Sequence, residues 1–180
     1  MMDPLAESTL QSKVFYRGKI LRLEQVQVRL PNGKQAQRDI VRHPGAVALL
    51  ALLDEGRKAL LVRQYRKAAE AAFWEIPAGT LEMGESPLEC AKRELNEETG
   101  YEAKTLTPLR RFYTAPGFCD ELITLFRAEG LFQSNKHAPP EDEFLQVQAF
   151  SLEEAEGLLE QGHICDAKTM LALALWRLAR

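Results

Sequence analysis

The sequence is poor in cysteine and histidine, with three of each among its 180 residues. Cys90, Cys119 and Cys165 are widely spaced and odd in number, which suits a reducing compartment better than a disulfide framework. The histidines are equally scattered, and neither Cys-x-x-Cys nor His-Glu-x-x-His, two spacings typical of zinc sites, occurs. We therefore expect a cytoplasmic protein that is neither disulfide-stabilised nor zinc-dependent.

Long hydrophobic runs and an excess of either charge are also missing. The longest apolar run, Ala46–Leu53, is too short to span a bilayer, and Met1–Lys13 lacks the basic start and apolar core of a signal peptide. The net charge is -3 and no segment is rich in lysine and arginine. We therefore expect no membrane and no nucleic-acid partner, and an anionic substrate would need local positive charge or a metal ion.

The remaining composition is that of an ordinary globular protein, with 46% hydrophobic and 27% charged residues. A chain of this length buries roughly two thirds of the surface that it exposes when unfolded. The sequence therefore predicts a packed core large enough to carry an enclosed site.

Four strands are marked clearly. The turn Pro31-Asn32-Gly33 predicts an antiparallel hairpin between Glu24–Leu30 and Gln35–Val41. The continuous apolar run Ala46–Leu53 and the segment Ala59–Tyr65 are typical of central strands covered on both faces, and we expect them to pair. Two later strands are expected at Leu122–Ala128 and Leu145–Phe150.

Helices are indicated by their capping residues. Ser86-Pro87-Leu88-Glu89 is a capping box, and it predicts a helix that stops at Gly100. A second capping box begins at Ser151, with a helix expected to end near Gly162, and Asp166 caps a last helix up to Arg180. The expected apolar face of that last helix consists of Ala167, Met170, Leu171, Ala174, Leu175 and Leu178. Strands before and after helices predict mixed α/β layering.

The segment Gly79–Tyr101, called the box below, is dense in carboxylates. Its glutamates are Glu82, Glu85, Glu89, Glu94, Glu97 and Glu98. An ordinary solvated acidic face would lie opposite the apolar stripe of the helix, which we expect at Leu88, Ala91 and Leu95. A helical wheel instead puts Glu94 and Glu98 beside this stripe.

Carboxylates stacked on one face repel each other unless a cation lies among them, and Mg²⁺ prefers several hard oxygen ligands. Arg93 can pair with Glu97 or Glu89 and hold the array in place. The pattern therefore favours a magnesium site at this helix.

The box resembles the signature of the Nudix hydrolase family. Gly79, five residues, Glu85, seven residues and then Arg93-Glu94-Leu95-Asn96-Glu97-Glu98-Thr99-Gly100 fill every invariant position, and only Tyr101 replaces the usual aliphatic residue. The resemblance implies an α/β (α+β) Nudix fold, in which a mixed β-sheet is sandwiched between helices and follows an N-terminal antiparallel β-hairpin region.

The flanks of the box resemble the ADP-ribose pyrophosphatase branch. Trp74-Glu75-Ile76-Pro77-Ala78 leads into the box, and Pro116 follows Gly100 by sixteen residues, although Pro116-Gly117 is also typical of an ordinary turn. The resemblance implies Mg²⁺ as cofactor, for which Mn²⁺ can substitute.

By the same resemblance, each site residue has an implied role. The main-chain carbonyl of Ala78 and the carboxylates of Glu94 and Glu98 bind the metal, and Glu97 assists. Glu85 and Arg93 orient the helix and loop. A glutamate of a late loop, Glu141 or Glu143, acts as general base or as a further metal ligand; an exposed acidic loop is the alternative for either residue.

The resemblance also implies a homodimer. Residues 1–43 would form a β region exchanged between subunits, and residues 44–180 the hydrolase domain. Arg38 and Asp39 would face the substrate, Arg66 would contact phosphate, and Tyr16 or Phe15 would stack on adenine.

The expected reaction is hydrolysis of ADP-ribose to AMP and ribose 5-phosphate, within the substrate class of nucleotide sugars. Other enzymes with the same box act on a different nucleotide sugar, such as GDP-mannose, or on nucleoside triphosphates. A non-catalytic nucleotide-sensing module is the alternative from another class, and it predicts eroded carboxylates in the box. All of them are present here.

Overall fold

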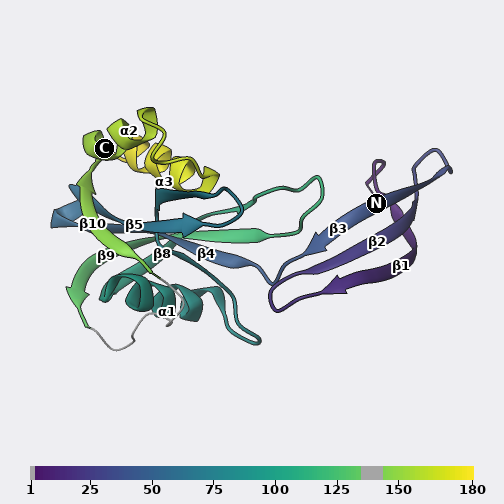
Figure 1. Ribbon diagram of the computed structural model, residues 1–180, viewed down its shortest axis with the longest axis horizontal. Helices are drawn as coiled ribbons and strands as arrows, with labels where there is room; N and C mark the ends of the chain where they lie inside the picture. The colour runs from purple at the N-terminus through teal and green to yellow at the C-terminus, as the bar shows by residue number, and fades with distance from the viewer. Residues whose placement is uncertain (1–2, 135–143) are drawn as a thin grey trace. The chain divides into compact units, whose positions relative to one another are not determined.

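The computed structural model describes residues 3–134 and 144–180. These residues form two compact units: residues 3–45 with Tyr113–Leu122, and the described residues of Ala46–Phe112 and Ile123–Arg180 (Figure 1). Within the described ranges, no helix is long and apolar enough to cross a membrane.

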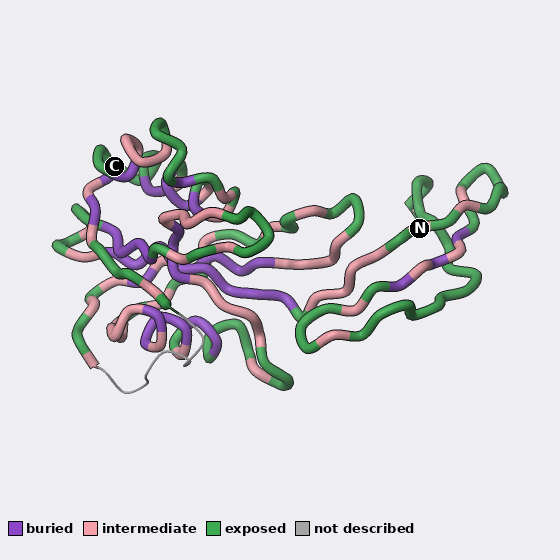
Figure 2. Tube along the Cα trace, in the orientation of Figure 1, coloured by how far each residue is buried: buried purple, intermediate pink, exposed green. Residues whose placement is uncertain are grey.

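The first unit contains an antiparallel sheet with the strand order β1 (Ser8–Arg17), β2 (Arg22–Arg29) and β3 (Gln35–Arg42). The predicted hairpin is confirmed as β2 and β3, with Arg29 opposite Gln35. Gly33 has φ 80° at the turn, a left-handed conformation that glycine adopts without strain. Strand β1 was not predicted. All ten of its residues are exposed (Figure 2), so the strand has no buried face that would require alternating apolar residues in the sequence.

The second unit is built on a mixed sheet with the strand order β10-β5-β4-β9-β8, to which β6 adds beside β5 and β7 beside β4. Strand β4 pairs antiparallel with β5 and parallel with β9. The strands are β4 (Ala46–Leu53), β5 (Lys58–Arg66), β6 (Ala71–Glu75), β7 (Ala78–Thr80), β8 (Tyr101–Tyr113), β9 (Leu122–Gln133) and β10 (Gln146–Ser151).

The expected pairing of the two apolar strands is confirmed by β4 and β5. Every residue of β4 up to Leu52 is buried, as the continuous purple segment in Figure 2 shows. The expectation of double coverage is wrong for the second half of β5, where Tyr65 is 57% exposed. The strand leaves the core at that point and reaches the surface beside the box.

In the described part of the chain, three α-helices cover the sheet: α1 (Pro87–Thr99), α2 (Leu152–Glu160) and α3 (Ala167–Leu178). Both predicted capping boxes are present, at Ser86 and Ser151, and the Asp166 side chain accepts a hydrogen bond from the Thr169 N–H. Gly100 ends α1 with φ 73°. A 3₁₀ turn, η1 (Asp54–Gly56), connects β4 and β5.

Strand β4 divides the interior into two cores, because successive side chains point to opposite faces of a sheet. Ala48, Leu50 and Leu52 pack with residues of α2 and α3, whereas Val47, Leu49 and Ala51 pack with residues of α1. The expected mixed sheet between helices is therefore confirmed (Figure 1).

Two details of the expected helix faces are wrong. Leu88 is 43% exposed, so the apolar stripe of α1 consists of Ala91 and Leu95 with Cys90 rather than Leu88. In α3 the buried residues are Thr169, Ala172, Leu173 and Trp176. Of the six residues expected to form its buried face, only Leu171 and Leu175 pack against the core, partly buried. Leu178 is 83% exposed.

Candidate active site

The side chain of Glu94 in α1 packs tightly against Gly79 of strand β7. Helix α1 packs on β7, and a Cβ added at Gly79 would lie only 1.8 Å from the carboxyl carbon of Glu94. Because real Cβ atoms do not approach other atoms so closely, position 79 accommodates Glu94 only when it carries no side chain. The glycine of the box thus creates the space for a buried carboxylate, of which only 9% is exposed.

A second buried carboxylate lies one helical turn further along α1. Glu98 is 7% exposed, and its Oε2 accepts a hydrogen bond of 2.9 Å from the main-chain N–H of Ala78. Both glutamates are therefore held at the same short strand, and their burial agrees with the helical wheel, which put them beside the apolar stripe. A fully solvated acidic face is excluded for these two residues.

Arg93 connects three carboxylates of the box, those of Glu85, Glu94 and Glu97. Its Nε and Nη2 donate to the two oxygens of Glu85, each at 2.9 Å, in a bidentate pair. Its Nη1 lies 2.6 Å from Glu94 Oε1 and 3.0 Å from Glu97 Oε2. Of the two partners expected for Arg93, Glu97 is confirmed. The alternative, Glu89, is not a partner of Arg93, because it accepts hydrogen bonds from Ser86 in the capping box.

These contacts determine the charge states around the helix. The hydrogen bonds from Arg93 lower the pKa of Glu85 to about 2. The same bonds raise the pKa of Arg93 above its usual value, so the guanidinium remains charged. Burial raises the pKa of the Cys90 thiol to about 12, and Cys90 is therefore a packing residue of α1 rather than a nucleophile.

The donor set fits a hard divalent cation. Glu85, Glu94 and Glu97 surround one arginine. Glu94 and Glu98 are buried, Glu94 against the main chain of Gly79 and Glu98 against that of Ala78. Within residues 3–134 and 144–180, no three acidic, histidine or cysteine side chains enclose a metal ion by themselves. Main-chain, water or substrate oxygens would have to complete the coordination, which is usual for Mg²⁺.

A cavity of about 710 Å³ opens beside the C-terminal end of α1. It is lined by Glu97 and Glu98, by residues 63–65 of β5, and by residues 144–147. Tyr65 and Phe144 present exposed aromatic rings to solvent, with 57% and 87% exposure. The cavity has the volume of a small-molecule site and contains two of the box carboxylates.

A cluster of charged side chains around the buried Glu75 lies at the end of β5. The Nε and Nη2 of Arg66 donate to the two oxygens of Glu75 at 2.9 and 2.8 Å, and the ammonium of Lys168 bonds to Glu75 and, at 2.9 Å, to Asp166. Burial raises the pKa of Glu75, but its bonds to Arg66 and Lys168 outweigh this effect, and the pKa is lowered. The hydrogen bonds to Glu75 raise the pKa of Arg66, and the charge of the Glu98 carboxylate adds to this rise.

Glu75 and Lys168 were not identified as site residues from the sequence. Glu75 is only 2% exposed. A charged residue between Trp74 and Ile76 was the available signal, since a buried charge requires a partner.

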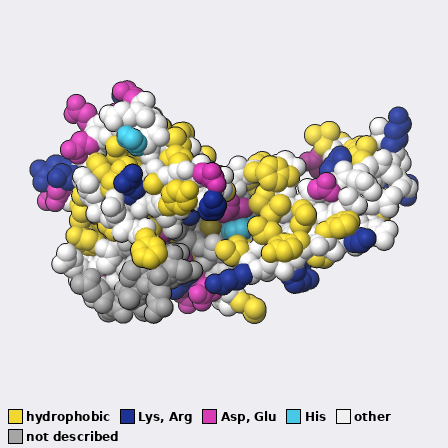
Figure 3. All heavy atoms as spheres, viewed as in Figure 1, with side chains coloured by type: hydrophobic (Ala, Val, Ile, Leu, Met, Phe, Trp, Pro, Cys, Tyr) yellow, Lys and Arg dark blue, Asp and Glu magenta, His cyan; other side chains and the backbone are white. Residues whose placement is uncertain are grey.

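The remaining expected substrate residues belong to the first unit. Arg38 forms an ion pair with Glu7 at 2.5 Å, and Asp39 accepts a hydrogen bond from Gln25 at 3.1 Å. Phe15 and Tyr16 on β1 are 56% and 58% exposed. Figure 3 shows hydrophobic side chains gathered over this unit.

Pro116 lies in a turn of the first unit in which Ala115 O accepts from the N–H groups of Phe118 and Cys119. The structure thus brings together Ala78, Glu85, Arg93, Glu94, Glu97 and Glu98, with Arg66 in the same unit. It does not place Tyr16, Arg38, Asp39 or Pro116 relative to them. Glu141 and Glu143 lie outside the described residues.

Comparison with known proteins agrees with this geometry. The family model described as the NUDIX domain matches residues 42–173. The chain is 49% identical over 173 residues to the ADP-ribose pyrophosphatase of Bacillus subtilis (strain 168), covering 96% of this chain and 93% of that protein.

Two further proteins are similar over nearly the whole chain. The methanol dehydrogenase activator of Bacillus methanolicus is 44% identical over 168 residues, covering 93% of this chain and 90% of that protein. A crystal structure of an ADP compounds hydrolase superimposes with a TM-score of 0.84 at 25% identity, covering 98% and 95% of the two chains.

Proposed function

This chain belongs to the Nudix family, and on that premise we propose that it hydrolyses ADP-ribose to AMP and ribose 5-phosphate with Mg²⁺ as cofactor. The observation that carries the proposal is that two buried carboxylates of α1 lie against β7: Glu94 in the space that Gly79 leaves open, and Glu98 at the main-chain N–H of Ala78. The choice of substrate is supported by the name of the relative that is 49% identical over nearly the whole chain.

The metal would be held by the carboxylates of Glu94 and Glu98 and by the main-chain carbonyl of Ala78, with assistance from Glu97. Mn²⁺ can take the place of Mg²⁺ in such an oxygen-rich site. When bound, a divalent ion neutralises charge on the diphosphate oxygens and polarises the phosphorus that is attacked.

The protein side chains contribute position and proton transfer. Arg93 and Glu85 fix α1 relative to the loop before it through their bidentate pair. Glu141 or Glu143 accepts a proton from water, whose oxygen forms a bond to one phosphorus while the bond from that phosphorus to the bridging oxygen breaks. The proton then passes to the departing phosphate, so that both products are monophosphates.

Side chains outside the box are proposed to bind the substrate. Arg66 contacts phosphate, a role supported by its position near Glu98. Arg38, Asp39, Pro116 and Tyr16, or Phe15 in place of Tyr16, would complete the nucleotide pocket. In this proposal residues 1–43 are exchanged between the subunits of a homodimer, residues 44–180 form the hydrolase domain, and the protein acts in the cytoplasm.

A substrate panel tests the proposal. Purified protein is incubated with Mg²⁺ and one of ADP-ribose, a dinucleotide that contains ADP, GDP-mannose or a nucleoside triphosphate, and the products are identified by chromatography. We expect the highest kcat/KM for ADP-ribose, with AMP and ribose 5-phosphate in equal amounts.

Each alternative function predicts a different result in this substrate panel. Preference for GDP-mannose would keep the reaction and change the substrate, and preference for a triphosphate would contradict the assigned branch. Tight binding of ADP-ribose without turnover of any compound would identify a nucleotide-sensing module.

A further inference from the structure

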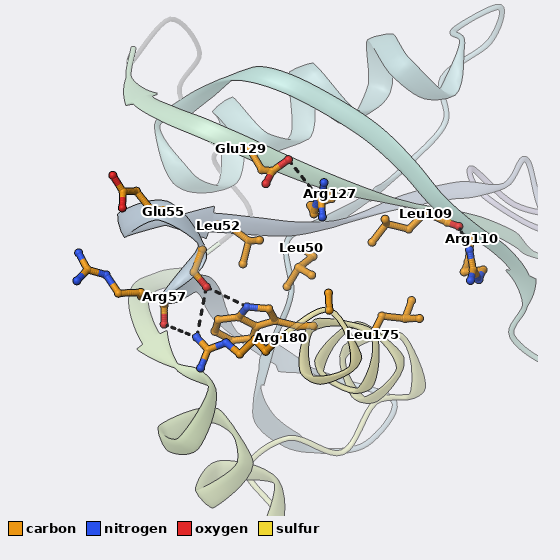
Figure 4. Close-up of a pocket in the computed structure, with 13 residues that line it drawn as sticks. Leu50, Leu52, Glu55, Arg57, Leu109, Arg110, Arg127, Glu129, Leu175 and Arg180 are labelled. Carbon is orange, nitrogen blue, oxygen red and sulfur yellow. Dashed lines mark hydrogen bonds and ion pairs between the residues drawn. The ribbon is translucent and has the colours of Figure 1, made fainter.

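A second cavity, of about 410 Å³, lies between the sheet and α3 (Figure 4). It belongs to the core that packs on α2 and α3, whereas α1 and the box pack on the other side of β4. None of its lining residues is part of the proposed active site. They are Leu50, Leu52, Glu55, Gly56, Arg57, Leu109, Arg110, Arg127, Glu129, Leu175, Trp176, Ala179 and Arg180.

The floor of this cavity is apolar and firmly held. Leu50 and Leu52 of β4, Leu109 of β8 and Leu175 of α3 point into the space between sheet and helix in Figure 4. The Trp176 indole is only 3% exposed and its N–H donates to the carbonyl of Gly56 at 3.0 Å. The floor is therefore a preformed apolar surface, and a ligand can bind to it without a rearrangement of these side chains.

Among the described residues that line the cavity, the rim carries four arginines but only two acidic side chains, Glu55 and Glu129. Arg127 is the one arginine of the four that has an ion pair in the described part of the chain, with Glu129 at 3.1 Å. The side chains of the other three hydrogen-bond to main-chain carbonyls: Arg57 to Asp54, Arg110 to Leu109, and Arg180 to Gly56 and to Arg57. These bonds orient the guanidinium groups without cancelling their charge.

We infer that this cavity binds a small organic anion, in which a carboxylate, sulfonate or phosphate group is attached to an apolar body. Apolar floors with a few oriented charged groups, in cavities of roughly 300 to 1,000 Å³, are typical of small-molecule sites. Guanidinium groups match the planar geometry of such anionic groups. The inference is independent of the proposed hydrolase activity, because it uses none of the box residues.

A pair of probes separates the charge from the apolar body. 1-Anilinonaphthalene-8-sulfonate and N-phenyl-1-naphthylamine share the same aromatic body, and only the first carries a sulfonate. Both become fluorescent in apolar surroundings, so binding is measured by titration. We expect the sulfonate to bind at least tenfold more tightly to the intact protein.

Arginine variants then locate the binding site. Arg110→Gln and Arg180→Gln should each weaken binding of the sulfonate roughly threefold to tenfold, the range expected for loss of one partly exposed charged contact. Arg177→Gln is the matched control, since Arg177 lies in the last turn of α3, three residues before Arg180, pairs with Glu156 and does not line the cavity. Binding of the neutral probe should be unchanged in all three variants.

The two tryptophans of the chain provide a direct reporter. Saturation with the sulfonate should shift the Trp176 indole N–H signal in an NMR spectrum and leave the Trp74 signal in place, with Trp176→Phe used to assign the two peaks. Equal affinity for both probes, unchanged affinity in Arg110→Gln and Arg180→Gln, or an unmoved Trp176 signal would each overturn the inference. Circular dichroism verifies that the variants are folded.

Discussion

Gly79 makes room for the Glu94 carboxylate because it has no side chain; the conformational freedom of a glycine backbone is not what this position requires. A Cβ there would also lie 1.9 and 2.3 Å from the two carboxylate oxygens of Glu94, which is itself buried. A methyl group at this position must displace either the carboxylate or strand β7. Gly79→Ala, the smallest possible substitution, therefore tests whether the observed position of the Glu94 carboxylate is required for function.

We predict that Gly79→Ala lowers kcat for ADP-ribose by roughly 10²-fold or more, because displacement of a catalytic group by about 1 Å has effects of this size. Gly157→Ala is the control: a Cβ at this position of α2 meets only Gln161 Nε2, at 4.0 Å. It should keep full turnover and gain roughly 0.5 to 1 kcal/mol in helix stability. Normal turnover in Gly79→Ala would show that catalysis does not require the Glu94 carboxylate to lie against Gly79.

The pair between Arg93 and Glu85 makes stability depend on pH in acid. The pKa of Glu85 falls from its ordinary 4.5 to about 2 in the folded protein. Between these values the unfolded chain binds the extra proton, so the contribution is complete above about pH 4.5 and is lost as pH falls toward 2.

We predict that, between pH 6 and pH 3, the free energy of unfolding of the unmodified protein falls by roughly 2 kcal/mol more than that of Glu85→Gln. Urea unfolding at the two pH values measures the difference. Glu82→Gln, an exposed neighbour, should behave like the unmodified protein. Equal acid sensitivity with and without Glu85 would contradict the role of this pair.

At the level of single residues, the core of the site could be predicted because it follows helical geometry. Glu94 and Glu98 are four residues apart, and both are buried on the side of α1 expected from the wheel. Leu88 was misjudged because a wheel gives direction around the helix axis but not how far along the axis the core extends. Glu75 and Lys168 were missed because their pairing joins β6 to α3, 93 residues apart in sequence.

Helix α3 was predicted as an element, but the wrong face was chosen. Its segment Leu171–Trp176 is apolar throughout, so periodicity alone leaves two faces open. The choice is made by long-range contacts. The Thr169 hydroxyl accepts a hydrogen bond of 3.0 Å from the Ile76 N–H, and both residues are buried.

We predict that Thr169→Val destabilises the protein by about 1 to 3 kcal/mol, because Val has the shape of Thr but leaves the buried Ile76 N–H without its acceptor. Thr169→Ser should retain more of the stability than Val does. Met170→Ala, at an exposed neighbour, should stay within about 0.5 kcal/mol of the unmodified protein. The measurement is chemical denaturation, and equal stability of the Val and Ser variants would refute the argument.

Strands β1 and β8 were not predicted because neither shows the alternation of buried and exposed residues that marks a half-buried strand. Their backbone pairing depends on neighbouring strands instead. The sheet centred on β4 could be predicted, since a continuous apolar run followed by a turn has few other structures available.

At the scale of the whole molecule, the first unit exposes many large apolar side chains, and exposed apolar patches often mark interaction surfaces. Its large hydrophobic residues with at least 36% exposure are Leu5, Leu10, Val14, Phe15, Tyr16, Ile20, Leu21, Leu23, Tyr113 and Phe118. Such a surface supports the proposed exchange of N-terminal strands between two subunits.

We predict a molecular mass in solution of twice that of one chain, measured by size exclusion with light scattering. Val14→Asp, which places a charge on exposed β1 at an apolar residue that is 43% exposed, should shift the protein toward monomer. Gln11→Asp is the control on the same strand, and it replaces an exposed polar residue. A monomeric unmodified protein would contradict the proposed dimer.

The account depends most on divalent cation binding by the buried carboxylates of α1. The direct measurement is Mn²⁺ binding by electron paramagnetic resonance, together with Mg²⁺-dependent ADP-ribose turnover, in the unmodified protein, Glu98→Gln and the control Glu82→Gln. We predict that Glu98→Gln remains folded, binds Mn²⁺ at least about tenfold more weakly and loses turnover by orders of magnitude, while Glu82→Gln matches the unmodified protein. Undiminished Mn²⁺ affinity and turnover in Glu98→Gln would contradict the account.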